Sequence, residues 1–371
     1  MNPENIKQKP TILILGKLPP PLMGPAIATQ IILNSTLKNE FDLVHLDTRM
    51  NTDVATMGRW SFSKMFRSVG IYVEFVQKIK HHQPQIILVP ISQTTMGFFK
   101  DAPFIWLGKW MGKKVLIQLR GSNFKNWINS ASGLTKSLVR TTLKKCVGVI
   151  VLGNNLKHLF KNYFTDEHIF VVPNGANYEL QTKNTTALNV LYLANFLPSK
   201  SFDDVLKALT ILKQKGIANF NFQAAGAWDN ETFKQQCLAI IEENQLTNVE
   251  LFPPQSGAAK MQLFANAAVF VFCPKMPEGH PWVMVEAMAN GLPIIATNQG
   301  AIIESVIDGK NGFIVPAESP ETIAEKLEVL INDTELRNQF AANSKQFYNS
   351  NFTEQKMVEN LAEVFKKFLW S

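Results

Sequence analysis

The chain has 371 residues, of which 46% are hydrophobic and 18% are charged. This composition excludes a disordered chain, and the length predicts two domains that each bury a core. Three cysteines, Cys146, Cys237 and Cys273, show neither metal-binding nor redox spacing, which favours a reducing compartment. No apolar stretch is long enough to cross a membrane and none resembles a signal peptide, so we expect a cytoplasmic protein.

The charge is divided unevenly along the chain. Residues 1–180 contain 22 Lys and Arg against 10 Asp and Glu, a formal charge of +12. Residues 181–371 contain 15 against 20, a charge of −5. A basic half suits nucleic acid, anionic lipid or an acidic substrate. No nucleic-acid-binding motif accompanies it, so we expect an anionic membrane surface rather than nucleic acid; ordinary surface charge is the alternative.

Short apolar runs alternate with amphipathic stretches, which predicts βα units and parallel sheets. In the first half we predict strands at residues 11–16, 42–46, 86–90, 115–119, 149–152 and 169–173. In the second half we predict strands at residues 190–194, 220–224, 249–252, 269–273, 294–297 and 313–315. The polar stretch 178–188 separates the two series and is the predicted linker, so the fold class is α/β with two doubly wound domains.

Two stretches of the first half mix Arg or Lys with Trp or Phe. They are residues 59–72 and residues 97–114. Both are able to lie on an anionic leaflet as amphipathic helices. For the second stretch, a helix buried in the first domain is the alternative.

Residues 278–291, EGHPWVMVEAMANG, carry the strongest functional signal. Glu278 comes just before a predicted helix, Glu286 lies inside it, and Gly291 is typical of a left-handed helix end. The N-terminus of a helix attracts phosphate, because its N–H groups are unpaired and carry partial positive charge. Carboxylates beside it accept hydrogen bonds from sugar hydroxyls. The segment therefore predicts a site for a sugar linked to a phosphate.

The spacing of the two glutamates is not specific by itself. Glu242 and Glu250 are also eight residues apart, and we interpret both as solvated surface residues. What distinguishes 278–291 is its context, because a buried strand and the string NQGAIIESVIDGKNGFIV (298–315) follow it. This context closely resembles the signature of the retaining glycosyltransferases of family 4, whose fold is called GT-B.

The resemblance implies the GT-B architecture, in which two Rossmann-like domains face a central cleft and a C-terminal helix crosses back to the first domain. Residues 1–180 would form the acceptor-side domain and residues 189–352 the nucleotide-sugar-binding domain. Residues 353–371 would form the returning helix.

The resemblance also assigns roles to the glutamate motif. Glu278 matches the glutamate that contacts the donor sugar near the reacting carbon, and Glu286 matches the one that holds ribose hydroxyls. For Glu286, a carboxylate favoured by the helix dipole is the alternative. Gly279 and His280 occupy the loop whose backbone N–H groups approach sugar and phosphate. Pro281 follows directly where many members have a longer turn, so one backbone donor is missing.

Other donor-binding positions match the family less completely. Lys200 matches the lysine that binds the diphosphate, whereas Asn195 stands in place of an arginine and Ser201 in place of a glycine. Gly24 matches the glycine of a loop that approaches the donor phosphates. Arg120 takes the position of a histidine, and it either clamps phosphate or pairs with a carboxylate.

The implied activity is transfer of a sugar from a nucleotide diphosphate sugar to a hydroxyl acceptor with retention of configuration. Glu278, Lys200 and Arg120 are the candidate catalytic residues. The resemblance implies neither cofactor nor metal, which agrees with the lack of an Asp-x-Asp or His cluster. We expect a glycan or lipid-linked acceptor in bacterial surface polysaccharide synthesis, at the inner face of the membrane. The alternatives are a nucleotide-sugar epimerase of the same fold and a non-catalytic nucleotide-sugar-binding subunit.

Overall fold

The protein is described by a computed structural model that covers residues 9–20, 23–49 and 62–370, without the side chains of residues 62–68. The chain divides into two compact units. The first unit comprises the residues up to Asn174 and those from Glu354 onward, and the second unit is Gly175–Thr353. Each unit contains a six-stranded sheet whose paired strands are all parallel.

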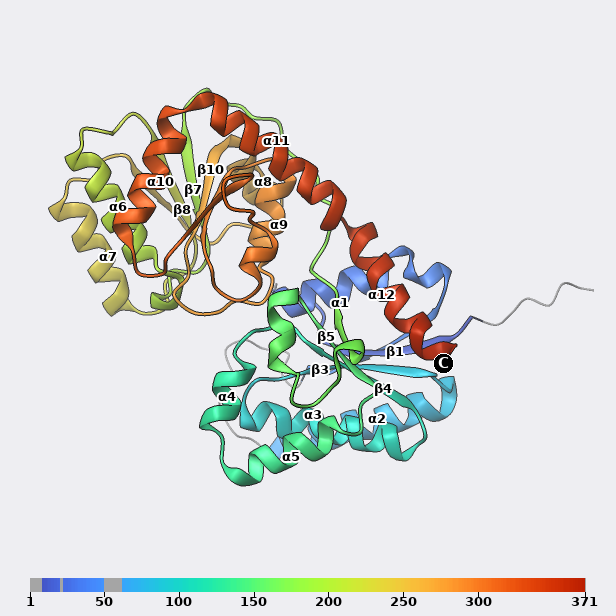
Figure 1. Ribbon diagram of the computed structural model, residues 1–371. Helices are drawn as coiled ribbons and strands as arrows, with labels where there is room; N and C mark the ends of the chain where they lie inside the picture. The colour runs from blue at the N-terminus through green and yellow to red at the C-terminus, as the bar shows by residue number, and fades with distance from the viewer. Residues whose placement is uncertain (1–8, 21–22, 50–61, 371) are drawn as a thin grey trace, which may run out of the picture. The chain divides into compact units, whose positions relative to one another are not determined.

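The sheet of the first unit has the order β2-β1-β3-β4-β5-β6. Its strands are β1 (Thr11–Gly16), β2 (Asp42–Asp47), β3 (Ile86–Ile91), β4 (Lys114–Leu119), β5 (Gly148–Val151) and β6 (Ile169–Val171). Its helices are α1 (Gly24–Asn34), α2 (Phe62–His82), α3 (Thr95–Trp110), α4 (Phe124–Ser130) and α5 (Gly133–Leu143). Short 3-10 helices are η1 (Thr36–Asn39), η3 (Asn154–Leu159) and η4 (Asp166–His168). Because helices cover both faces of the sheet (Figure 1), β1, β4 and β5 are buried along nearly their whole length and are mostly apolar.

The sheet of the second unit has the order β12-β11-β10-β7-β8-β9. Its strands are β7 (Asn189–Leu193), β8 (Asn221–Ala225), β9 (Val249–Phe252), β10 (Ala267–Phe272), β11 (Ile294–Thr297) and β12 (Gly312–Val315). Its helices are α6 (Phe202–Gln214), α7 (Glu231–Glu243), α8 (Gly257–Asn266), α9 (Trp282–Ala289), α10 (Pro320–Asn332) and α11 (Thr334–Asn351), with 3-10 helices η5 (Pro198–Lys200) and η6 (Ala301–Glu304). The order is that of a Rossmann sheet, and it reverses between β7 and β10.

Alternate residues of β7 supply the two cores of the second unit. Val190 and Tyr192 face one core with α6, α7 and α10, whereas Leu191 and Leu193 face the other with α8, α9 and α11. Figure 1 shows these two groups of helices on opposite faces of the sheet. All the predicted strands are present, and their ends agree with the prediction to within two residues.

The C-terminal helix α12 (Glu354–Leu369) packs on the first unit, beside β1 and α1 in Figure 1. Leu361 and Phe365 are fully buried, and the ring of Phe365 lies 5.6 Å from that of Phe41. Lys114 Nζ donates a hydrogen bond to the Phe368 carbonyl oxygen at 2.6 Å. The expected return of the last helix to the first domain is confirmed.

The predicted linker 178–188 lies within the second unit, since the division falls after Asn174. Its backbone is hydrogen-bonded to α8. The Asn184 N–H donates to Asn266 Oδ1 at 3.1 Å, and Gln262 Nε2 donates to the Thr182 carbonyl oxygen at 3.1 Å. Polar composition suggested a free connection, but these side chains of α8 hold the segment against the unit.

The stretch 97–114 forms most of α3, which has two different faces. Phe98, Phe104 and Ile105 are buried, whereas Phe99 and Trp110 are exposed, Trp110 by 82%. One face of α3 is therefore buried, as the alternative expects, and contact of the exposed face with an anionic leaflet stays a prediction. Of the other stretch, 59–72, residues 59–61 lie outside the described residues, as do the side chains of 62–68. None of the described helices combines the length and apolar composition that crossing a membrane requires.

Candidate functional site

Two loops meet where the order of the second sheet reverses. One follows β7 and contains residues 194–201, and the other follows β10 and contains residues 273–281. Ligands of open parallel sheets bind at the carboxyl ends of the strands, at such a switch point. The Lys275 N–H donates to the Ser199 carbonyl oxygen at 2.9 Å, which ties the loops together.

The two loops bring Lys200 and Glu278 together. Lys200 Nζ forms an ion pair with Glu278 Oε1, although 78 residues separate them in the sequence. Their side chains are 20% and 21% exposed, so both can reach a ligand. The ammonium also lies 5.4 Å from the centroid of the Phe272 ring. A cation suited to a diphosphate and a carboxylate suited to a sugar therefore stand side by side.

Ser201 shows why a glycine is expected after this lysine. Its φ of 58° and ψ of 37° lie in the left-handed region, immediately before α6 begins at Phe202. A side chain makes this conformation costly. The Ser201 hydroxyl is buried and has no hydrogen-bond partner among the described residues. Serine is thus accommodated here under strain.

A glycine on the neighbouring loop holds the backbone of Glu278. Gly300 has a φ of 64°, and a Cβ atom on it would lie 1.8 Å from the Glu278 carbonyl oxygen. The N–H of Ala301 donates to the carbonyl oxygens of Glu278 at 3.1 Å and Gly279 at 3.2 Å. The loop after β11 therefore fixes the backbone from which the Glu278 carboxylate extends.

Glu286 is buried in α9 and forms an ion pair with Lys260 of α8. Burial raises the pKa of Glu286, and the Lys260 ammonium opposes that rise. Glu286 Oε2 has no hydrogen-bond partner among the described residues. Because no acidic residue lies in the first turn of α9, a dipole-stabilised N-terminal carboxylate does not describe Glu286.

The helix that carries Glu286 ends as predicted. Gly291 has a φ of 67°, and its N–H donates to the Met288 carbonyl oxygen at 2.9 Å. The Leu292 N–H reaches back to the Ala287 carbonyl oxygen at 3.0 Å. These two bonds form a Schellman motif.

His280 supports the site loop from inside the protein. Its side chain is buried, and Nε2 lies 2.8 Å from Ser305 Oγ. Burial lowers the pKa of His280 to about 3, so the ring is neutral at ordinary pH. Pro281 precedes α9 in an extended conformation and contributes no N–H, as the sequence indicates.

Asn195 and the second pair of glutamates with the same spacing, Glu242 and Glu250, also lie in the second unit. Asn195 Oδ1 accepts a hydrogen bond from the Ala227 N–H at 3.3 Å, so the side chain is held by its oxygen. Glu242 and Glu250, which share the spacing of the motif, are both exposed. The expectation that they are solvated surface residues is confirmed.

Gly24 and Arg120 belong to the first unit. Gly24 begins α1, and Arg120 directly follows β4. Arg120 is half-buried, and burial alone lowers the pKa of its guanidinium to about 10. It therefore remains charged, and no carboxylate of the described residues is close enough to shift its pKa. A carboxylate pair is therefore not found among the described residues, and the phosphate clamp stays a prediction.

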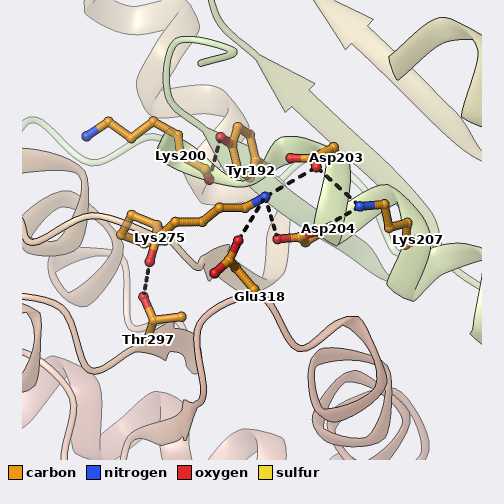
Figure 2. Close-up of polar contacts among 9 residues, drawn as sticks. Tyr192, Lys200, Asp203, Asp204, Lys207, Lys275, Thr297 and Glu318 are labelled. Carbon is orange, nitrogen blue, oxygen red and sulfur yellow. Dashed lines mark hydrogen bonds and ion pairs between the residues drawn. The ribbon is translucent and has the colours of Figure 1, made fainter. Parts of the chain in front are cut away.

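Several polar side chains of the site were not predicted from the sequence. Lys260 gives no signal in its helix, and Lys275 lies just upstream of the glutamate motif. Figure 2 shows Lys275 among Asp203, Asp204 and Glu318, with its ammonium directed at their carboxylates. No group of three or more His, Cys, Asp or Glu residues suited to a metal ion occurs in the described part of the chain.

Comparison with known proteins shows that the second unit, which contains this site, is similar to a known family. Residues 176–347 match the family described as glycosyl transferases group 1. An uncharacterized glycosyltransferase of Methanocaldococcus jannaschii is 30% identical over 216 residues, which cover 58% of this chain and 57% of that protein. The capsular polysaccharide biosynthesis glycosyltransferase CapM of Staphylococcus aureus is 28% identical over 240 residues, which cover 60% of this chain and 62% of CapM. The chain thus spans about three fifths of the length of these relatives.

The fold is also similar to that of solved structures. The crystal structure of Anabaena HepE in complex with UDP superposes with a TM-score of 0.73 at 15% identity, covering 96% of this chain and 100% of that one. At this identity the likeness concerns the fold. Residues 176–347 are therefore similar to the group 1 glycosyl transferases, and the two parallel sheets of the chain have the GT-B fold.

Proposed function

We propose that the protein is a retaining glycosyltransferase that moves a sugar from a nucleotide diphosphate sugar to a hydroxyl acceptor. The observation that carries the proposal is the ion pair of Lys200 and Glu278 on the loops at the switch point of the second sheet. Both residues lie in the stretch that matches the family. UDP, which is bound in the Anabaena structure, is the first nucleotide to test.

The pair suits the charges that develop as the glycosidic bond breaks. Negative charge grows on the departing diphosphate, and positive charge grows on the sugar ring. The Lys200 ammonium would stabilise the first, and the Glu278 carboxylate the second. The acceptor hydroxyl would attack from the face that the diphosphate leaves, and a phosphate oxygen would take its proton. This course retains the anomeric configuration without a covalent nucleophile.

We propose that the leaving group is neutralised by the protein without a divalent metal. Lys200 would supply a full charge, and the Asn195 amide nitrogen would donate a hydrogen bond, since Asn195 Oδ1 already accepts one from the Ala227 N–H. In the first unit, Arg120, which has no carboxylate partner among the described residues, suits a phosphate clamp. Full activity after EDTA treatment would support this account, whereas a loss that Mg²⁺ restores would contradict it.

For the acceptor we propose a glycan or lipid-linked glycan of a bacterial surface polysaccharide, met at an anionic membrane surface. CapM, a relative, is named for capsular polysaccharide biosynthesis. On α3, Phe99 and Trp110 are exposed together with Lys100 and Lys109. Aromatic and basic side chains on one helix suit the headgroup region of an anionic leaflet. Failure to co-sediment with phosphatidylglycerol vesicles at low salt would contradict membrane contact.

One experiment distinguishes this function from its alternatives. UDP-, GDP- and ADP-sugars are titrated calorimetrically, and each sugar that binds is then incubated with the protein and its products identified. Transfer or hydrolysis of the sugar supports the proposal. A changed sugar configuration on the intact nucleotide would indicate an epimerase. Binding without turnover would indicate a non-catalytic subunit, an alternative that Asn195 and the strained Ser201 favour.

A further inference from the structure

Lys275 joins the loop of Lys200 to the loop of Glu278. It precedes Glu278 by three residues in the loop after β10. Its backbone N–H donates to the carbonyl oxygen of Ser199, the residue before Lys200, at 2.9 Å. One end of the lysine is therefore attached to both halves of the candidate site.

The side chain of Lys275 reaches the start of α6, which follows the Lys200 loop. Its Nζ lies 3.0 Å from Asp204 Oδ2 and 3.4 Å from Asp203 Oδ2, and Glu318 Oε1 of the loop after β12 is 4.0 Å away. Both aspartates belong to the first turn of α6. Asp204 is buried, and Lys275 is only 23% exposed, so these interactions are less screened than surface pairs.

Two further hydrogen bonds hold the segments that Lys275 connects. Tyr192 Oη donates to the Lys200 carbonyl oxygen at 3.2 Å, and Thr297 Oγ1 donates to the Pro274 carbonyl oxygen at 2.7 Å. Figure 2 shows both bonds beside the Lys275 cluster, with the Lys200 ammonium directed away from it. The backbone of Lys200 is thus attached to the cluster, while its charged end stays available for the site.

We propose that Lys275 is a positioning residue that sets the separation of Lys200 and Glu278. The inference rests on the proposed glycosyl transfer, which needs both groups at defined distances from the breaking bond. The charge of Lys275 is already balanced by Asp203 and Asp204, so Lys275 does not replace the arginine that Asn195 displaces. Displacements of about 1 Å in such a site can cost about a hundredfold in rate.

Lys207 provides a matched control. It pairs with the same two aspartates, at 3.3 Å from Asp203 Oδ2 and 3.0 Å from Asp204 Oδ1. It lies on α6 with them and is 49% exposed, so it connects no loops. Substituting Lys207 or Lys275 takes one positive charge from the same carboxylates. Only the Lys275 substitution also removes the side-chain link between the loop after β10 and the start of α6, and it keeps the backbone hydrogen bond to Ser199.

The test compares Lys275→Met, Lys275→Arg and Lys207→Met on UDP-glucose, GDP-mannose or ADP-glucose, whichever the wild type turns over. We expect Lys275→Met to lower kcat by about ten- to a hundredfold with a smaller change in KM for the donor. Lys275→Arg should recover most of the rate, because a guanidinium also reaches both carboxylates. Lys207→Met should stay within about threefold of the wild type, because its exposed pairs are weak.

Two outcomes would overturn the positioning role. The variant K275M/D203N/D204N removes the charge left on the aspartates but does not restore the side-chain link of Lys275 to α6, so its kcat should stay low. A wild-type kcat in this variant would mean that only the unbalanced charge matters. If Lys275→Met and Lys207→Met lost rate equally, in proportion to the fall in their melting temperatures, the role of Lys275 would be structural only. A wild type that turns over none of the donors contradicts the proposed function, whereas these outcomes contradict the positioning role in an active enzyme.

Discussion

Substituting Lys260 by methionine should lower the free energy of unfolding, because the buried Glu286 carboxylate loses its ion-pair partner. Glu286 is 5% exposed, and Lys260 is its ion-pair partner. Removing one partner of a buried pair costs about 3–5 kcal/mol, because the remaining charge is left without compensation. Lys260 is itself 21% exposed, so water can partly replace it, and we expect the lower end of that range. A loss of about 3 kcal/mol lowers the melting temperature of a domain of this size by about 6–12 °C.

The loss should depend on pH. Burial raises the pKa of Glu286 in the folded protein and Lys260 opposes that rise, so the pKa should climb further in Lys260→Met. A carboxyl group whose pKa is higher in the folded than in the unfolded chain gains a proton on folding. Its stabilising effect is complete below the unfolded pKa and is lost as the pH rises through the folded pKa. The variant should therefore be closest to the wild type near about pH 4.5 and weakest near about pH 8.

Thermal unfolding followed by circular dichroism at the two pH values measures this effect. Lys234→Met is the matched control, because its pair with Glu231 is exposed and should change the midpoint by only about 1–2 °C. The double variant K260M/E286Q removes the buried charge and should recover part of the stability at pH 8. A Lys260→Met midpoint that is unchanged, or that falls equally at both pH values, would refute the reasoning.

Three further predictions concern the loops of the site. Ser201→Gly should raise the free energy of unfolding by about 1 kcal/mol, because it removes left-handed strain and a buried unpaired hydroxyl; a lower urea midpoint would contradict this. Gly300→Ala should abolish transfer by displacing the Glu278 backbone, whereas Gly309→Ala, also at positive φ but with no atom near its Cβ, should keep activity within about threefold. The His280 ring should show no NMR titration between about pH 5 and 8, because burial keeps it neutral over that range. A titration midpoint near about pH 6.5 would contradict this prediction.

The strands and the motif helix could be predicted because their signals are local. Each parallel strand is a short apolar run, since both of its faces are covered. The end of α9 was predicted from Gly291 alone, because few residues other than glycine adopt its left-handed conformation. The return of α12 came instead from the family resemblance, since nothing local shows which core Phe365 will join.

The partners of the site residues could not be predicted, because they are distant in sequence. Lys260 and Glu286 are 26 residues apart on different helices, and only the packing of α8 beside α9 brings them together. For the same reason Lys200 and Glu278 were assigned separate roles, and their ion pair was not foreseen. The segment 178–188 was misjudged as a linker because side chains of α8, not its own residues, hold it.

The most direct test of the central claim is the kcat of Glu278→Gln and of Lys200→Met for sugar transfer or donor hydrolysis, measured beside the wild type. These substitutions keep the size of the side chains and remove the charges of the pair. We expect the wild type to release a nucleoside diphosphate, and each variant to lose at least about a thousandfold in rate while keeping its circular dichroism spectrum. Near-native rates in either variant would contradict the assignment of this pair to glycosyl transfer.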